Sequence, residues 1–294
     1  RAMVGSSGGG FALMEEAISL AGMTETPLLL VLSSRPGPST GVPTYTAQGD
    51  LNFALGQGHG DFTKIVASPS GATEAFGLAA EMLDLAWKFQ VPAILLTEKH
   101  LSESRMSVDI DAGKAAWPLP TMHAEGEYKR YLDTPDGVSP LLFPPSTELV
   151  KWNSYEHDEN GITSDTPEGI VRMHDKRNRK AVALAGHMKG LRTVNVFGDG
   201  GATIFTYGST TLSVLEAVRH AGLHAKVVQP IFLEPFPEWE MEKHRGQDAI
   251  VVEQSSTGQF ARLLRERAGI RVKQVMVKYD GRPFEPAELA TQLR

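Results

Sequence analysis

The chain has 294 residues, of which 41% are hydrophobic and 22% are charged, and its formal net charge is −6. This length is ample for two packed domains, and the composition is that of an ordinary soluble globular protein. The negative charge argues against a general nucleic-acid binder. The absence of cysteine excludes a disulfide scaffold, cysteine-ligated zinc and a cysteine-held iron–sulfur cluster within these residues.

No apolar run reaches the roughly 18–20 residues that a membrane-spanning helix needs, and no signal peptide is visible. We therefore expect no membrane association and a cytoplasmic location. The chain begins at Arg1 and enters a short strand and a Gly-rich turn almost at once. From this start we expect that a segment upstream of Arg1 is missing from the sequence.

Residues 1–112 predict alternating strands and helices, which is typical of a parallel sheet covered by helices on both faces. The runs "PLLLVLS" and "VPAILLTEK" are apolar without alternation, as buried strands are. Ser70 is the expected cap of the long helix. Strands are predicted at 3–4, 27–33, 63–69 and 91–99, and helices at 11–23, 49–60 and 70–90.

Residues 113–190 predict an ordered connector with one helix. "WPLP", "DTPDGVSP" and "FPPS" are turn sequences, and Thr166, Pro167 and Glu168 signal a helix over 166–188. Residues 191–294 predict a second parallel α/β domain of common size. Its strands are expected at 202–209, 225–231, 249–256 and 272–279, and its helices at 211–222, 238–246 and 258–269.

The most informative stretch is "SRPGPSTGVPT", residues 34–44, which follows a buried strand. Buried parallel strands present functional groups at their carboxyl ends, and Arg35 stands there with a planar fork suited to a carboxylate or phosphate. Ser39, Thr40 and Thr44 can donate to anionic oxygens, and the prolines stiffen the turn. Two interpretations are open: an anion-binding site, or a rigid turn in which Arg35 pairs with a neighbouring acid.

Other polar motifs have structural interpretations beside the functional ones. The glycines of "GSSGGG", Gly8 and Gly10 among them, could cradle an anion with their backbone N–H groups, or form a tight strand-to-helix turn at a subunit contact. "GHGD" (58–61) could line a pocket or form a capped loop. We predict an acidic surface turn for "EHDENG" (156–161), a turn before a strand for "GDGG" (198–201), and a solvated helix face for the basic run 172–180.

Several blocks occur in an order that resembles the alpha subunit of 2-oxoacid:ferredoxin oxidoreductases. The similarity covers essentially the whole chain and is highest to the 2-oxoglutarate type, and the RPGPSTG-x-PT block is its most specific part. "GDGG" is similar to the start of the thiamine diphosphate and Mg²⁺ motif, but the asparagine pair expected about thirty residues later is absent. The blocks are 34–62, 89–104, 152–168, 207–222, 234–237 and 279–284.

The resemblance implies that residues 1–112 are the C-terminal portion of a thiamine diphosphate enzyme's pyrimidine-binding domain. Residues 191–294 would be a transketolase C-terminal-like domain, and 113–190 a connector. It further implies that a separate beta subunit holds most of the cofactor, its Mg²⁺ and an iron–sulfur cluster. The expected assembly is a dimer of such heterodimers with ferredoxin as the electron acceptor.

The reaction implied is oxidative decarboxylation of a 2-oxo acid, 2-oxoglutarate in the first instance, to acyl-coenzyme A and CO₂. Arg35 would anchor the substrate carboxylate, with Thr44, Ser39 and Thr40 beside it and Gly8 and Gly10 near the cofactor. The resemblance places the cofactor-activating glutamate upstream of the Gly-rich turn, so these residues contain no catalytic group and no metal site of their own.

Three alternatives stay open. The substrate could be pyruvate, or the chain could be a non-catalytic fragment that only serves assembly with the beta subunit. It could also be half of a transketolase-type enzyme, against which the RPGPSTG block argues. The sequence does not decide the 2-oxo acid, the number of subunits or the electron acceptor.

Overall fold

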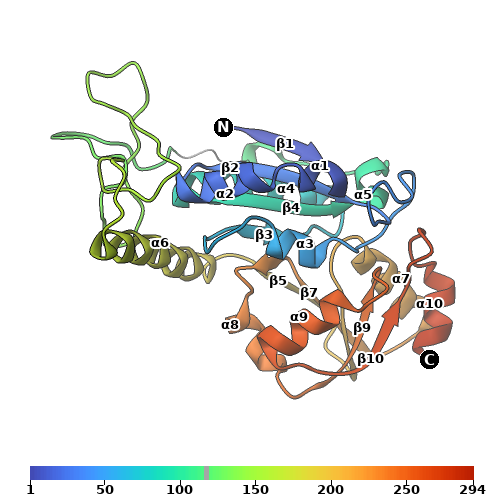
Figure 1. Cartoon of the computed structure of the whole chain (residues 1–294). Coiled ribbons are helices and arrows are strands. Elements are labelled where there is room, and N and C mark those ends of the chain that lie inside the picture. The colour runs from blue at the N-terminus through green and yellow to red at the C-terminus, as the bar shows by residue number, and fades with distance from the viewer. Residues whose placement is uncertain (116–118) are drawn as a thin grey trace.

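A computed structural model describes residues 1–115 and 119–294 and confirms an α/β fold built on parallel sheets (Figure 1). Within those residues the first sheet has the strand order β1-β2-β4-β3-β8, and the second has the order β10-β9-β6-β7-β5. All pairings are parallel except those of β8 with β3 and of β5 with β7. The first sheet consists of β1 (Met3–Ser6), β2 (Leu28–Ser34), β3 (Ile65–Ala67), β4 (Pro92–Glu98) and β8 (Phe232–Glu234).

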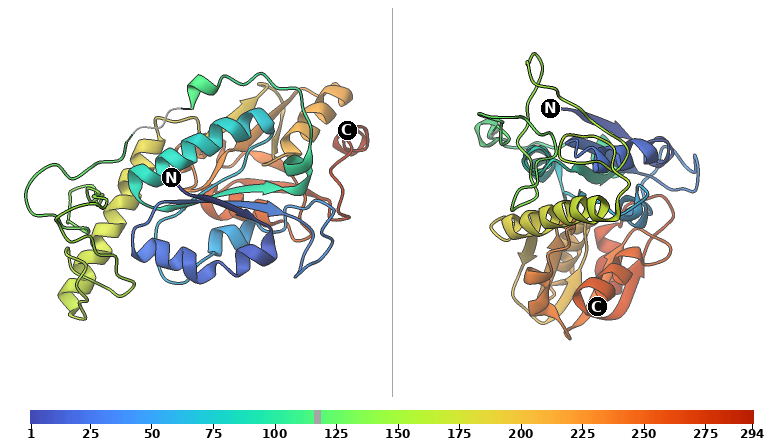
Figure 2. Two further views of the ribbon diagram at one scale, coloured as in Figure 1. Left: turned by 90° about the horizontal axis from the view of Figure 1, so that it is seen from above. Right: turned by 60° about the vertical axis from the view of Figure 1, so that its left-hand side comes forward.

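Helices cover both faces of the first sheet, as Figure 2 shows from above. Alternate side chains of a strand point to opposite faces. Leu30 and Ile94 accordingly pack in one core cluster with residues of α1 (Gly8–Ala12), α2 (Glu15–Met23) and α3 (Leu51–Gly56). Leu29 and Ala93 pack in the other cluster with α4 (Ala72–Phe89). Burial on both faces explains why these strands are apolar throughout.

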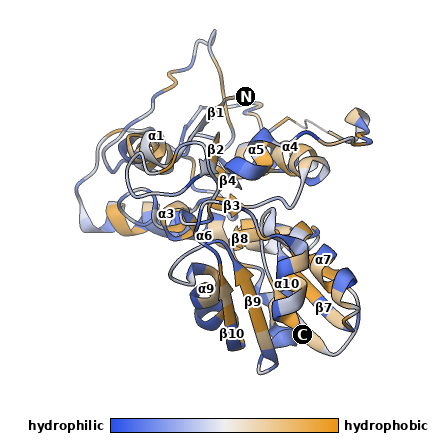
Figure 3. Ribbon diagram, turned by 90° about the vertical axis from the view of Figure 1, so that its right-hand side faces the viewer, coloured by the Kyte–Doolittle hydropathy of each residue, from blue (hydrophilic) through white to orange (hydrophobic). Residues whose placement is uncertain are grey.

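The second sheet consists of β5 (Val194–Phe197), β6 (Ala202–Phe205), β7 (Ala225–Pro230), β9 (Asp248–Glu253) and β10 (Arg271–Val277). Figure 3 shows its apolar strands between α9 and the α7 and α10 pair. On one face pack α7 (Thr210–Ala221) and α10 (Pro286–Leu293), and on the other α9 (Gln259–Ala268). Helix α8 (Glu238–Met241) is short and continues as a 3₁₀ turn, Glu242–His244.

The segment between the sheets forms loops at one end of the molecule beside α6 (Pro167–Met188), as Figures 1 and 2 show. It follows α5 (Lys99–Glu103) and a 3₁₀ turn, Ala112–Lys114. The predicted start of α6 is confirmed, because Thr166 Oγ1 accepts a hydrogen bond from Gly169 N–H. Trp117 and Pro118 of the "WPLP" turn lie outside the described residues.

The basic run on α6 was predicted to be solvated, and that prediction is wrong for Lys176, Arg177 and Lys180, while Arg172 is exposed as predicted. Lys176 and Lys180 are fully buried and both pair with the buried carboxylate of Glu25. Arg130 joins them by donating to the carbonyl oxygens of Thr24 and Glu25. Burial alone would raise the pKa of Glu25, but the lysines outweigh it and hold that pKa far below its usual range. Helical spacing of charges cannot reveal that Lys176 pairs with a buried acid 151 residues away in the sequence.

Two predicted helix starts also differ from the structure. The single helix expected at 11–23 is interrupted, because Met14 N–H bonds to the carbonyl of Phe11 in a 3₁₀-type turn before α2 begins. Ser70 does not cap α4, whose N-cap is Gly71. Instead the N–H and the hydroxyl of Ser70, the residue before the N-cap, both donate to the carboxylate of Glu74 in the first turn, at 2.6 and 2.8 Å.

Strands β5 and β8 were not predicted. Each is short and pairs antiparallel at the edge of its sheet, so neither has the long apolar run of a central parallel strand. No helix within residues 1–115 or 119–294 is both long enough and apolar enough to span a membrane.

Candidate functional site

The carboxyl ends of β2 and β4 lie side by side and present polar groups at one edge of the first sheet. Ser34 of β2 pairs in register with Glu98 of β4, and Arg35 follows directly after Ser34. Gly8 begins α1 just after β1, the neighbour of β2. The parallel order therefore gathers Gly8, Arg35 and Glu98 on the edge where α/β proteins bind ligands.

Arg35 lines a cavity of about 230 Å³ at this edge. Among residues 1–115 and 119–294 its guanidinium has no hydrogen-bond or ion-pair partner. Asp50 also lines the cavity and accepts a hydrogen bond from Ser34 Oγ at 2.8 Å. Burial raises the pKa of Asp50, while Ser34 and the positive charge of Arg35 oppose that rise. The remaining lining residues are Gly8, Gly9, Ala12, Gly37, Pro38, Ser39 and Phe53.

The loop after Arg35, residues 36–45, folds back on itself. Val42 N–H donates to the carbonyl of Pro36 at 2.9 Å, and Tyr45 N–H donates to that of Val42. Gly41 has φ +54°, and a Cβ there would lie 1.7 Å from the Pro36 carbonyl oxygen, so only glycine fits at this closure. We call residues 35–45 the Arg35 loop.

The structure brings some of the expected site residues together and leaves others apart. Ser39 and Gly8 line the cavity with Arg35, whereas Thr40 and Thr44 are exposed elsewhere on the loop and do not line it. Gly10 also lies off the cavity. A Cβ on Gly10 would lie 1.9 Å from Ser6 Oγ, so this glycine allows the strand-to-helix turn to close tightly.

The sequence interpretation missed two acidic residues, Asp50 and Glu98. Glu98 is fully buried, and its Oε1 accepts a hydrogen bond from Ser209 N–H of the second half of the chain at 2.7 Å. Burial raises the pKa of Glu98 to about 7 against the opposing effect of Ser209. A usable signal was present, because Glu98 ends a buried parallel strand as Arg35 does.

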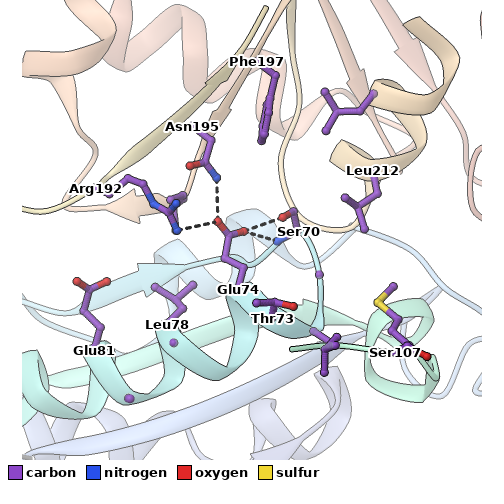
Figure 4. Close-up of a pocket in the computed structure, with 18 of the residues that line it drawn as sticks. Ser70, Thr73, Glu74, Leu78, Glu81, Ser107, Arg192, Asn195, Phe197 and Leu212 are labelled. Atoms are coloured by element: carbon purple, nitrogen blue, oxygen red, sulfur yellow. Dashed lines mark hydrogen bonds and ion pairs between the residues drawn. The ribbon is translucent and has the colours of Figure 1, made fainter. Parts of the chain in front are cut away.

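A larger cavity of about 790 Å³ lies where α4 begins, against β5 and α7. Figure 4 shows Glu74 at its centre, bonded to Ser70 and Asn195 and close to Arg192. Burial would raise the pKa of Glu74, but hydrogen bonds from Ser70, Gln229 and Asn195 lower it below its usual value. Its carboxylate is occupied in joining α4 to strands β5 and β7 of the second sheet. We therefore place the candidate site at the smaller cavity, around Arg35.

The remaining motifs form turns. In "GHGD", His59 N–H bonds to Ser19 Oγ, and the imidazole lies 3.6 Å from the Glu16 carboxylate at the surface. Asp61 lines a cavity of about 540 Å³, so the pocket-lining interpretation holds for Asp61. The "GDGG" turn precedes β6 as predicted, with Gly198 at φ +75°. "EHDENG" is a turn held by Asp158.

Two residues of "EHDENG" depart from the surface turn that was predicted. His157 is fully buried and stacks on Tyr131, with ring centres 3.8 Å apart. Glu156 forms a two-point ion pair with Arg177 of α6. The stack packs two parts of the connector against each other, and the ion pair holds the connector against α6.

Known proteins are similar to this chain over nearly its whole length. The family model "pyruvate flavodoxin/ferredoxin oxidoreductase, thiamine diphosphate-binding" matches residues 1–176. The alpha subunit of a 2-oxoacid:ferredoxin oxidoreductase from Saccharolobus solfataricus is 35% identical over 97% of this chain and 47% of its own length. The 2-oxoglutarate synthase subunit KorA of Methanothermobacter thermautotrophicus is 29% identical over 100% of this chain and 80% of its own length.

A solved structure is similar over nearly the whole chain. It is 2-oxoglutarate:ferredoxin oxidoreductase from Magnetococcus marinus, with 2-oxoglutarate, coenzyme A and succinyl-coenzyme A bound. The TM-score is 0.90 at 31% identity, covering 99% of this chain and 52% of the other. The chain thus spans about half the length of that protein and of the Saccharolobus relative.

Proposed function

Because the chain belongs to the 2-oxoacid:ferredoxin oxidoreductase family, we propose that it is the alpha-subunit part of an enzyme that oxidatively decarboxylates a 2-oxo acid. The substrate proposed is 2-oxoglutarate, with coenzyme A as acyl acceptor and ferredoxin as electron acceptor. The names of the relatives support this assignment, since they include a 2-oxoglutarate synthase subunit and a structure with 2-oxoglutarate bound.

The observation that carries the proposal is the guanidinium of Arg35, which lines a cavity without an ion-pair partner among the described residues. A guanidinium can hold a carboxylate by two parallel, charge-assisted hydrogen bonds. The cavity offers Ser39 as a further donor. Arg35 would orient the substrate carboxylate, and holding a substrate in its reactive orientation lowers the entropic part of the barrier.

Part of the cavity wall leaves room for thiamine diphosphate to lie beside it. A Cβ on Gly9 would meet no atom within 4 Å, so the backbone there faces open space, whereas a Cβ on Gly8 would lie 3.3 Å from the Asp50 carboxylate. Bound cofactor would supply the electron sink for loss of the carboxylate. Gly8 and Gly9 would admit it closely, while Arg35 would hold the substrate.

The partners belong to the same proposal. We assign a beta subunit as the main holder of the cofactor, its Mg²⁺ and the iron–sulfur cluster, in a cytoplasmic dimer of heterodimers. The proposed domains are a pyrimidine-binding part at 1–112, a connector at 113–190 and a transketolase C-terminal-like domain at 191–294.

Substitution of Arg35 in the reconstituted complex tests the function. Loss of charge-assisted hydrogen bonds commonly costs about 1.5–3 kcal/mol, so Arg35→Ala should raise KM for the 2-oxo acid about ten- to a hundredfold. Arg35→Lys should recover little, because an ammonium cannot bind in two parallel bonds. The assay follows reduction of ferredoxin or of an artificial one-electron acceptor, with the exposed Arg265→Ala on α9 as the matched control.

The same assay separates the alternatives. Higher kcat/KM for pyruvate than for 2-oxoglutarate would change the substrate but keep the function. A wild-type complex that assembles yet oxidises no 2-oxo acid would leave the chain as an assembly component. Unchanged kinetics in Arg35→Ala would reject the anchoring role.

A further inference from the structure

The turn between β10 and α10, residues 278–285, contacts the chain where the Arg35 loop ends. Thr46 N–H donates to the carbonyl of Gly281 at 3.0 Å. The guanidinium carbon of Arg282 lies 4.9 Å from the ring centre of Tyr45, a distance at which a cation is attracted to the ring face. Two segments far apart in the sequence therefore meet one residue beyond Thr44.

This β10–α10 turn is itself held in shape. The carboxylate of Asp280 accepts hydrogen bonds from the Lys278 ammonium at 2.8 Å and from Arg282 N–H at 3.1 Å. Gly281 is buried at φ +83°, and a Cβ there would lie 3.0 Å from Tyr45 Cβ. A side chain would be strained at this φ and would press on Tyr45. The contact thus depends on glycine.

The Arg35 loop needs such support, because residues 37–45 are exposed. At its start the loop continues from β2, which is paired along its length with β4. At its end the chain becomes buried at Thr46, whose Oγ1 also accepts a hydrogen bond from His100 N–H at 3.2 Å. The β10–α10 turn therefore contacts the loop at the end opposite Arg35.

We propose that the β10–α10 turn sets the position of the Arg35 loop, with Gly281 and Arg282 as positioning residues for binding of the 2-oxo acid. This inference rests on the proposed function, because the ligand of the loop is the carboxylate assigned there. Arg282 acts through Tyr45 rather than by touching the substrate. A loop ordered in advance loses less conformational freedom on binding, and the affinity is higher for that reason.

The test uses the whole reconstituted complex. Arg282→Met keeps the length of the side chain and removes the cation, so KM for 2-oxoglutarate should rise about two- to fivefold. The KM for coenzyme A should stay unchanged, and kcat should fall little. Arg282→Lys should keep most of the affinity, and Gly281→Ala should raise KM further. Arg271→Gln, on β10 away from the turn, is the control.

Hydrogen exchange of residues 36–48 in the same complexes gives a second readout that needs no turnover. Faster exchange in Arg282→Met than in Arg271→Gln supports the role of the turn. That result would stand even if the wild-type complex oxidised no 2-oxo acid, which would reject the proposed function instead. Unchanged exchange and unchanged KM in Arg282→Met overturn the inference. If Gly281→Ala fails to assemble, the Arg282 variants still decide.

Discussion

Glu98 connects the two halves of the chain by a hydrogen bond, and its protonation state affects stability. It is buried at the end of β4 and accepts the Ser209 N–H just before α7. Burial raises the pKa of Glu98 from 4.5 to about 7. Between these two pH values the folded protein keeps the proton on Glu98, whereas the unfolded chain has released it. The contribution of Glu98 to stability is therefore complete at low pH and is lost as the pH rises through about 7.

Glu98→Gln should remove this pH dependence. Between pH 5 and pH 7 the free energy of unfolding of the wild type should fall relative to that of the variant, by up to about 1.4 kcal/mol per pH unit. Urea unfolding at pH 5, 6 and 7 measures the difference. Burial lowers the pKa of Lys180 to about 7, so this residue makes the free energy of unfolding rise with pH above about pH 7. Lys180 is present in both proteins and therefore does not affect their comparison.

The matched control for this prediction is Glu216→Gln. Glu216 is partly exposed on α7, and Arg219 lowers its pKa to about 2, which is below the range tested. This control should keep the wild-type slope. An equal slope in Glu98→Gln would show that Glu98 is already ionised in the folded protein at pH 5.

At the scale of an element, helix α6 is fixed to the first sheet by the charges around Glu25. Glu25→Gln would leave Lys176, Lys180 and Arg130 buried without their counter-charge, a kind of change that costs about 3–5 kcal/mol. We expect a lower thermal midpoint and faster hydrogen exchange in α6 and the connector. The exposed Glu266→Gln on α9 should change neither quantity. A wild-type midpoint in Glu25→Gln would mean that packing alone holds α6 in place.

The elements that could be predicted from the sequence are those whose cause is local. Apolar runs long enough for buried strands gave β2, β4 and β9, and the Thr166–Pro167 start gave α6. Edge strands β5 and β8 were not predicted, because their pairing depends on partners that are distant in the sequence. The buried lysines of α6 were misplaced for the same reason, since Glu25 lies far away in the sequence.

The candidate site could be predicted to a similar extent. The place of Arg35 follows from a strand end and a stiff turn, so the sequence was sufficient for it. Asp50, Glu98 and the Gly281 contact lie on other segments that only the folded chain brings near. Their roles depend on tertiary distances, which the patterns in one segment do not contain.

The described residues of the molecule form two sheets that share one interior. Leu30 and Ile94 of the first sheet belong to the same core cluster as Phe205 and Phe260 of the second half, and β8 completes the first sheet from the second half of the chain. Gln48 joins them by polar contacts. It donates to the Tyr207 carbonyl and accepts from Thr210 Oγ1 and Gln254 N–H, each at 2.9 Å. We therefore expect both sheets to unfold together.

Gln48→Leu tests whether that shared interior makes the chain one cooperative unit. The substitution leaves the partners of the Gln48 amide unsatisfied in a buried place, and each such group costs about 1–3 kcal/mol. The apolar cluster remains, so calorimetry of the purified chain should show a lower midpoint but still one transition. The exposed Gln292→Leu on α10 should keep the wild-type midpoint. Two separated transitions in Gln48→Leu would show that the sheets are independent domains joined mainly by the Gln48 contacts, because an apolar interface that held them together would have kept the unfolding concerted.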